Sequence, residues 1–129
     1  CDLSSVAYAV LLSQPYDYPM PSDEQTKAWT YYDYTYAMVN RLTSLTSLPV
    51  LLMVTPEVDG DLRTALHDLS PSTVRVVEVP LVEVKGIGRE NQRWRYTGSK
   101  LIPYNMTDYS QILTMDSDTF MLHNADNVF

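Results

Sequence analysis

The chain has 129 residues, of which 45% are hydrophobic, and this is enough for one domain of ordinary size with its own core. Its formal net charge of −7 argues against a nucleic acid polymer as a partner, because contacts to phosphate need clustered Lys and Arg side chains. A lone cysteine, Cys1, excludes a disulfide framework within the chain, and no apolar run approaches the length of a membrane span.

Two continuous apolar runs in the first half of the chain predict buried strands. They are Val6 to Leu12, "VAYAVLL", and Val50 to Thr55, "VLLMVT". Runs of this kind are typical of parallel strands that are covered on both faces. A helix is predicted between them, over about residues 27–46, because large side chains recur there at intervals of three and four. The predicted core face of this helix comprises Ala28, Tyr31, Thr35, Met38, Leu42 and Leu45.

Strands and helices continue to alternate in the second half. The predicted elements are a helix capped by Asp59 or Asp61 and running to about Leu69, a strand over 72–79, a helix over 97–108 that tolerates Pro103, a strand over 111–115 and a short extended segment over 119–124. This alternation predicts an α/β fold with a Rossmann-like, mostly parallel sheet and helices on both faces.

An acidic pair, Asp116 and Asp118, directly follows the apolar strand "QILTM". Ligands of open parallel sheets gather beyond the carboxyl ends of the strands. Two carboxylates at positions i and i+2 of an extended segment point to the same side and repel each other, and a divalent cation relieves that repulsion. Mg²⁺ and Mn²⁺ prefer such oxygen ligands and share them with substrate phosphates. The sequence therefore predicts a metal site that holds a diphosphate.

The Asp-x-Asp pattern is weakly specific by itself. A second pair, Asp59 and Asp61, follows a strand, a proline and a polar turn, and it is most simply a helix-capping cluster. The alternative interpretation of Asp116 and Asp118 is likewise a solvated turn. Their position directly after a buried strand, with no turn between, distinguishes them from the first pair.

The whole C-terminal third resembles the glycogenin-like family 8 glycosyltransferases. The matching features are Lys100-Leu101 on a helix, Tyr109 before an apolar strand, Asp116-Ser117-Asp118-Thr119 at the strand end, and the ending Asn124-Ala125-Asp126-Asn127-Val128-Phe129. The segment "VLLMVTPEVDGDLRTAL" also resembles the second strand and following helix of that family. The resemblance covers nearly the whole chain, strongly over residues 94–129 and more loosely before them.

The resemblance implies a GT-A fold and transfer of a sugar, with retention, from a nucleotide-diphosphate donor that is usually UDP-linked. It implies that Asp116 and Asp118 bind Mn²⁺ (or Mg²⁺), and that Lys100 contacts the phosphate or sugar of the donor. An arginine of the preceding loop, Arg93 or Arg89, would assist. The implied donor-binding residues are Ser13, Gln14, Arg93, Lys100, Asp116 and Ser117.

The family's catalytic domain is longer than this chain. Residues 1–129 are therefore expected to form the nucleotide-sugar-binding part of a glycosyltransferase catalytic domain whose C-terminal part, including a third metal ligand, is missing. The alternative is a non-catalytic nucleotide-binding or interaction module. A sugar-nucleotide pyrophosphorylase is disfavoured, because "SQPYDYPMPSDEQ" after the first strand lacks the glycines that cradle phosphates. The acceptor, the sugar and the compartment, cytosol or Golgi lumen, stay open.

Overall fold

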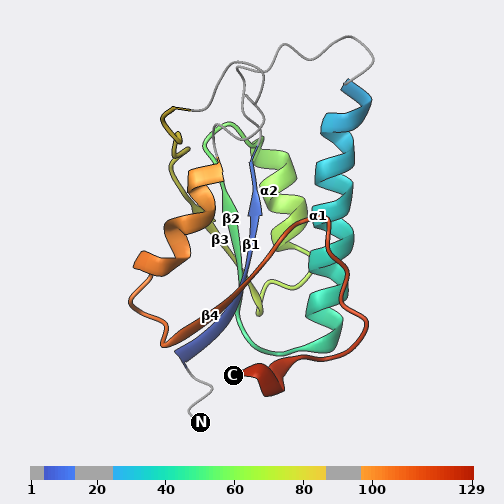
Figure 1. The fold of residues 1–129 in the computed structure, drawn as a ribbon. Coiled ribbons are helices and arrows are strands. Elements are labelled where there is room, and N and C mark those ends of the chain that lie inside the picture. The colour runs from blue at the N-terminus through green and yellow to red at the C-terminus, as the bar shows by residue number, and fades with distance from the viewer. Residues whose placement is uncertain (1–4, 14–24, 87–96) are drawn as a thin grey trace.

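The computed structural model describes residues 5–13, 25–86 and 97–129. Its four strands form one parallel sheet in the order β3-β2-β1-β4 (Figure 1). The strands are β1 (Val6–Leu12), β2 (Val50–Val54), β3 (Val74–Glu78) and β4 (Gln111–Met115). The prediction of a parallel α/β fold is thus confirmed, and the strand order is consistent with a Rossmann-like arrangement.

Helices cover both faces of this sheet, as predicted. The α-helices α1 (Gln25–Leu45) and α2 (Gly60–His67) lie on one face, and the 3₁₀ helix η3 (Thr97–Asn105) lies on the other. Asp59 is the residue that caps α2, because its side chain accepts a hydrogen bond from the backbone N–H of Asp61 at 2.8 Å. Among the described residues, no helix combines the length and the apolar character needed to cross a membrane.

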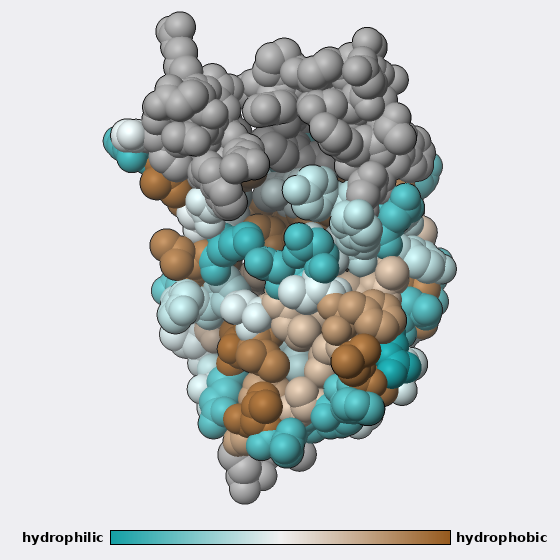
Figure 2. Space-filling model, turned by 45° about the vertical axis from the view of Figure 1, so that its right-hand side comes forward, coloured by the Kyte–Doolittle hydropathy of each residue, from teal (hydrophilic) through white to brown (hydrophobic). Residues whose placement is uncertain are grey.

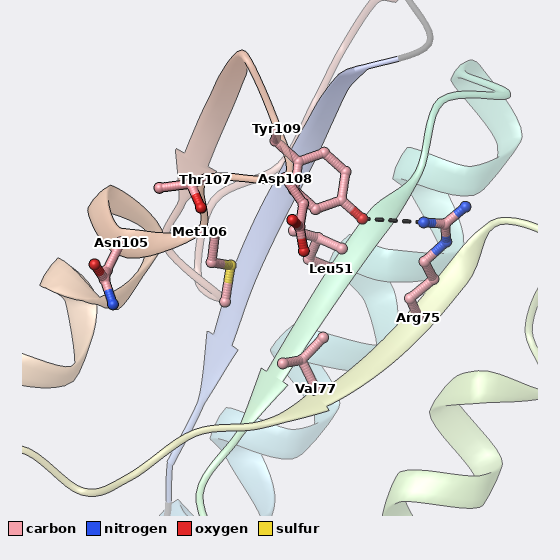
Figure 3. Close-up of a pocket in the computed structure, with 8 residues that line it drawn as sticks. All are labelled: Leu51, Arg75, Val77, Asn105, Met106, Thr107, Asp108 and Tyr109. Atoms are coloured by element: carbon pink, nitrogen blue, oxygen red, sulfur yellow. Dashed lines mark hydrogen bonds between the residues drawn. The ribbon is translucent and has the colours of Figure 1, made fainter.

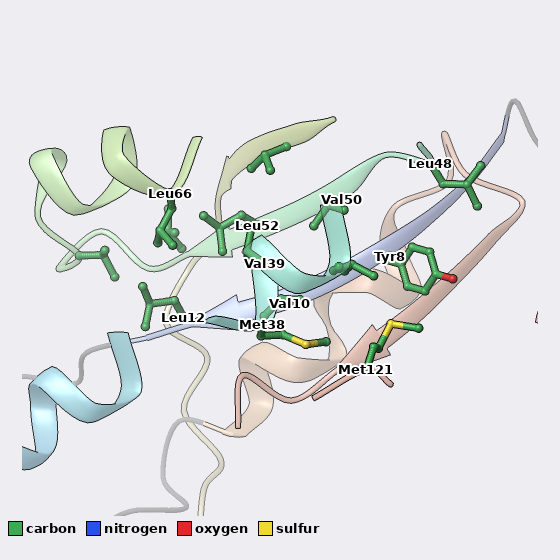
Figure 4. Packing of buried hydrophobic residues seen from close by; sticks show 14 of the residues in the cluster. Tyr8, Val10, Leu12, Met38, Val39, Leu48, Val50, Leu52, Leu66 and Met121 are labelled. Carbon is green, nitrogen blue, oxygen red and sulfur yellow. The ribbon is translucent and has the colours of Figure 1, made fainter. Parts of the chain in front are cut away.

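Alternate residues of the central strands build a core on each face of the sheet. On the α-helical face, Tyr8, Val10 and Leu52 are fully buried against Met38 and Leu42 of α1, among others (Figure 4). On the other face, the small side chains of Ala7 and Ala9 leave room for Ile102 and Met106 of the η3 region; Leu51 and Met53 complete that layer. Continuous apolar strands are therefore required here, because both faces of β1 and β2 are covered.

Three sequence predictions were wrong in detail. The helix expected over 97–108 is a 3₁₀ helix that ends at Asn105, because Pro103 lacks the N–H that an α-helix needs and 3₁₀ turns suit short segments. Residues 119–124, expected to form a short extended segment, bend at residues 122 and 123. Tyr31 of α1, expected in the core, is 56% exposed, because the buried face of the helix is centred on Thr35, Met38, Val39 and Leu42.

The C-terminal segment after β4 crosses α1 and returns toward the amino ends of the strands (Figure 1). Arg41 of α1 holds it there: its Nε and Nη2 donate to the carbonyl oxygens of Met121 and Leu122 at 3.0 and 2.8 Å. The exposed side chains of Phe120 and Leu122 add apolar surface to this side. Figure 2, turned toward α1, shows such hydrophobic patches interspersed with hydrophilic surface.

Candidate functional site

Three of the residues predicted to bind a donor, Ser13, Asp116 and Ser117, follow two neighbouring strands, β1 and β4. The chain fills the sheet from β1 through β2 to β3 and then returns to place β4 on the opposite side of β1. The strand order therefore reverses between β1 and β4, and crevices at such a reversal bind ligands in open parallel sheets. Ser13 directly follows β1, and Asp116 directly follows β4.

Asp116 and Asp118 lie in a turn and not in an extended segment. The backbone N–H and the hydroxyl of Thr119 donate to the carbonyl oxygen of Asp116 at 3.1 and 2.7 Å, which closes the turn over Ser117 and Asp118. The prediction that two extended residues would aim both carboxylates to the same side was therefore wrong in its geometry. Both aspartate residues are exposed. Ser117, the residue between them in the sequence, is partly buried.

Lys100 is brought to this turn by the start of η3. The buried Ser99 hydroxyl accepts from the Val82 N–H at 2.8 Å and donates to the Pro80 carbonyl oxygen at 3.0 Å. Gly98 allows this close approach, because a Cβ there would lie 2.8 Å from both Cγ1 and the carbonyl oxygen of Val82. These contacts hold the start of η3. Lys100 follows Ser99, and its side chain extends from there to Asp116 at the end of β4.

The Lys100 ammonium donates a hydrogen bond to Asp116 Oδ1, and the two side chains form an ion pair. Two residues that are 16 positions apart, and that were singled out separately from the sequence, are thus in direct contact. Asp118 makes no hydrogen bond or ion pair within the part of the chain that the structure describes. The turn therefore presents one carboxylate that is engaged by a cation and one that is open to solvent.

The chemistry of these side chains fits a hard divalent cation that is completed by other ligands. Mg²⁺, and by extension Mn²⁺, is commonly held by one or two carboxylates, with water and substrate phosphates filling the remaining positions. Asp116 and Asp118 can supply two such oxygens. Over the described ranges, no three His, Cys, Asp or Glu side chains gather into a metal site formed by protein ligands alone.

The remaining predicted donor residues are placed only in part. Ser13 is partly buried at the carboxyl end of β1, next to the strand that precedes the acidic turn. Gln14, Arg93 and the alternative Arg89 lie outside the described residues. The structure thus joins Lys100 to Asp116 and places Ser117 and Asp118 beside them.

A hollow of about 380 Å³ lies away from these residues, on the η3 face of the sheet (Figure 3). Its floor is apolar, and at its edge Arg75 Nη1 donates to the Tyr109 hydroxyl at 3.0 Å. The lining residues are Leu51, Arg75, Val77, Asn105, Met106, Thr107, Asp108 and Tyr109. None of the predicted donor residues is among them, so this hollow is not the site that the sequence predicts.

The C-terminal Asn-x-Asp motif, which contributed to the family resemblance, forms a structural anchor. Asp126 accepts hydrogen bonds from the Tyr8 hydroxyl at 2.8 Å and from Thr46 Oγ1 and Asn124 Nδ2 at 2.9 Å each. Burial alone would raise the pKa of Asp126, but these three hydrogen bonds outweigh it and lower the pKa. Burial and the Asp126 carboxylate together raise the pKa of Tyr8.

This anchor was not identified from the sequence, because its partners lie in three separate segments. Tyr8 belongs to an apolar strand and Thr46 follows α1, so neither carries a local signal of contact with Asp126. An indirect signal was available: a tyrosine within an otherwise aliphatic buried strand needs a partner for its hydroxyl. Phe129 also packs edge-on against Tyr8, with ring centroids 5.3 Å apart.

No protein-family model matches this chain, and no curated protein shows significant similarity to it.

Proposed function

We propose that this chain binds the nucleotide-diphosphate part of a sugar donor, typically UDP-linked, as the donor-binding part of a retaining glycosyltransferase of GT-A fold. In this proposal, Asp116 and Asp118 hold Mn²⁺ or Mg²⁺, Lys100 binds the diphosphate, and Ser13 and Ser117 contact the nucleoside. Gln14 and a loop arginine, Arg93 or Arg89, are assigned to the donor by the family resemblance alone.

The contact between Lys100 and Asp116 carries the proposal. A diphosphate that is bound through a metal needs carboxylates for the metal and a nearby cation for the remaining phosphate charge. This pair supplies both groups at the carboxyl end of β4. The location at the reversal of strand order gives independent support, because the preference for ligands there follows from sheet topology and not from residue identity.

Each group has a distinct part in the proposed chemistry. A bound divalent cation would offset the charge that develops on the diphosphate as the bond to the sugar breaks. The Lys100 ammonium would stabilise the same charge from its fixed place on η3. Ser99, held by two hydrogen bonds to the segment after β3, keeps the start of η3 in position, so that the backbone of Lys100 lies beside the acidic turn before a ligand binds.

Calorimetric titration of UDP into the chain, with and without Mn²⁺, tests this proposal. We expect binding that depends on Mn²⁺ and is reduced at least about tenfold in Asp116→Asn/Asp118→Asn, since each substitution removes a charged metal ligand. Asp59→Asn/Asp61→Asn is the matched control, because it removes the same two charges from the other Asp-x-Asp pair, which caps α2.

Equal loss of UDP binding in both double variants would contradict the assignment, because it would reflect net charge or stability and not a metal site. Binding of UDP without any dependence on Mn²⁺ would also contradict it.

A further inference from the structure

The ion pair between Lys100 and Asp116 has a consequence for how the proposed site is filled. The Lys100 ammonium lies directly on Oδ1 of Asp116, which is one of the two oxygens that this carboxylate could offer to a metal. Both side chains are about half exposed, at 52% and 56%, so water can replace either partner when the pair separates. Neither group is fixed in the pair by burial.

Two cations cannot occupy one carboxylate without repelling each other. A divalent ion close to Asp116 would meet the positive charge of Lys100 at short range, and the repulsion between them falls only as the inverse of their separation. The repulsion therefore favours departure of the ammonium from Asp116 as the metal arrives. The four-carbon stem of Lys100 has rotatable bonds that permit this movement without displacement of η3.

We propose that Lys100 is an internal counter-ion that competes with the metal for Asp116 until a diphosphate accepts the ammonium. In the empty site, Lys100 neutralises Asp116 and weakens binding of a free divalent ion. When the metal arrives together with a diphosphate, Lys100 transfers from Asp116 to a phosphate oxygen, and both cations then have anionic partners. This inference rests on the proposed function and adds cooperativity to it: metal and nucleotide bind together more favourably than either binds alone.

The inference predicts opposite effects of one substitution on two ligands. Lys100→Met removes the charge but retains most of the apolar stem. Free Mn²⁺ should bind about two- to fivefold more tightly to this variant, because the gain is limited to the strength of one exposed ion pair. UDP in the presence of saturating Mn²⁺ should bind more weakly, since the diphosphate loses a charge-assisted hydrogen bond.

Electron paramagnetic resonance of Mn²⁺ provides the first measurement, because the signal of the free ion decreases when the ion binds protein. Titration of UDP at saturating Mn²⁺ provides the second. Lys85→Met is the control: it removes the same charge from an exposed position outside the pair. Lys100→Arg keeps the charge and should keep the weak binding of free Mn²⁺. Circular dichroism confirms that each variant is folded.

Tighter Mn²⁺ binding in Lys100→Met, but not in Lys85→Met, supports the inference. An unchanged or weaker affinity for Mn²⁺ in Lys100→Met overturns it, while Mn²⁺-dependent UDP binding by the unaltered chain would leave the proposed function standing. Equal gains in Mn²⁺ affinity in Lys100→Met and Lys85→Met would show that the effect comes from net charge, and this result would also overturn the inference. If neither the unaltered chain nor Lys100→Met binds Mn²⁺, the inference and the metal-dependent function are both wrong.

Discussion

Asp126 connects three parts of the molecule through one carboxylate: β1 through Tyr8, the residue after α1 through Thr46, and its own turn through Asn124. The hydrogen bonds hold its pKa below the ordinary value, so the folded state favours the ionised form. A group with a lowered pKa in the folded state contributes stability above its unfolded pKa and loses it as the pH falls through the folded value. Acid should therefore release the C-terminal segment.

We predict that Asp126→Asn lowers the free energy of unfolding by about 1–3 kcal/mol at pH 7, because the buried Tyr8 hydroxyl then donates to a neutral acceptor. The difference from the unaltered chain should begin to shrink as the pH falls below about 4, where the carboxylate is protonated in the unfolded state, and should be lost below the lowered pKa of Asp126 in the folded state. Urea unfolding over a pH series measures both effects. Asp108→Asn, an exposed aspartate without such contacts, is the control, and a difference that does not vary with pH would contradict the prediction.

At the scale of elements, the close approach of Gly98 to Val82 helps to position η3. Gly98→Ala should destabilise the fold by about 1–3 kcal/mol, because the new methyl group would lie 2.8 Å from the backbone and side chain of Val82. Displacement of η3 should also weaken Mn²⁺-dependent UDP binding through Lys100. Gly60→Ala is a matched control, since nothing lies within 4 Å of a Cβ at the start of α2, and it should change stability by less than about 1 kcal/mol.

Thermal unfolding and UDP titration of the two variants separate these expectations. If Gly98→Ala is as stable as Gly60→Ala, the contact with Val82 does not constrain η3. If Gly98→Ala is destabilised but binds UDP normally, η3 does not position Lys100.

Elements with a strong local pattern could be predicted from the sequence, and those set by long-range contacts could not. The apolar runs of β1 and β2 and the alternation of helices identified the parallel sheet. Tyr31 was misplaced because the spacing of α1 also permits a face shifted by one residue, and packing on the sheet decides between them. For the candidate site, the residue types of Lys100 and Asp116 were enough to single out both residues. The turn at Ser117 was not predicted, because it depends on hydrogen bonds from Thr119 to the carbonyl oxygen of Asp116 that the sequence pattern does not reveal.

Across the whole molecule, the sheet has a protected centre and two outer strands. β1 pairs with β2 and β4, and β2 pairs with β1 and β3, whereas β3 and β4 each have one neighbour in the sheet of the described residues. We predict that backbone amides of β1 and β2 exchange hydrogen most slowly, and that those of β3 and β4 exchange faster through local opening. Hydrogen exchange followed by mass spectrometry, corrected for intrinsic rates, measures this order. Protection in β4 equal to that in β1 would contradict it.

The segment between β4 and Asp126 is fastened at both of its ends, and Arg41 holds it near the middle. An unattached chain loses about 1–2 kcal/mol of conformational entropy for each residue that becomes ordered. Here, much of that ordering accompanies folding, so the acidic turn has few alternative conformations left when a ligand arrives. Preorganisation of this kind favours tighter binding without any added contact. For the proposed ligand, a hydrogen bond between Tyr8 of β1 and Asp126 would therefore contribute to the affinity of residues that it does not contact.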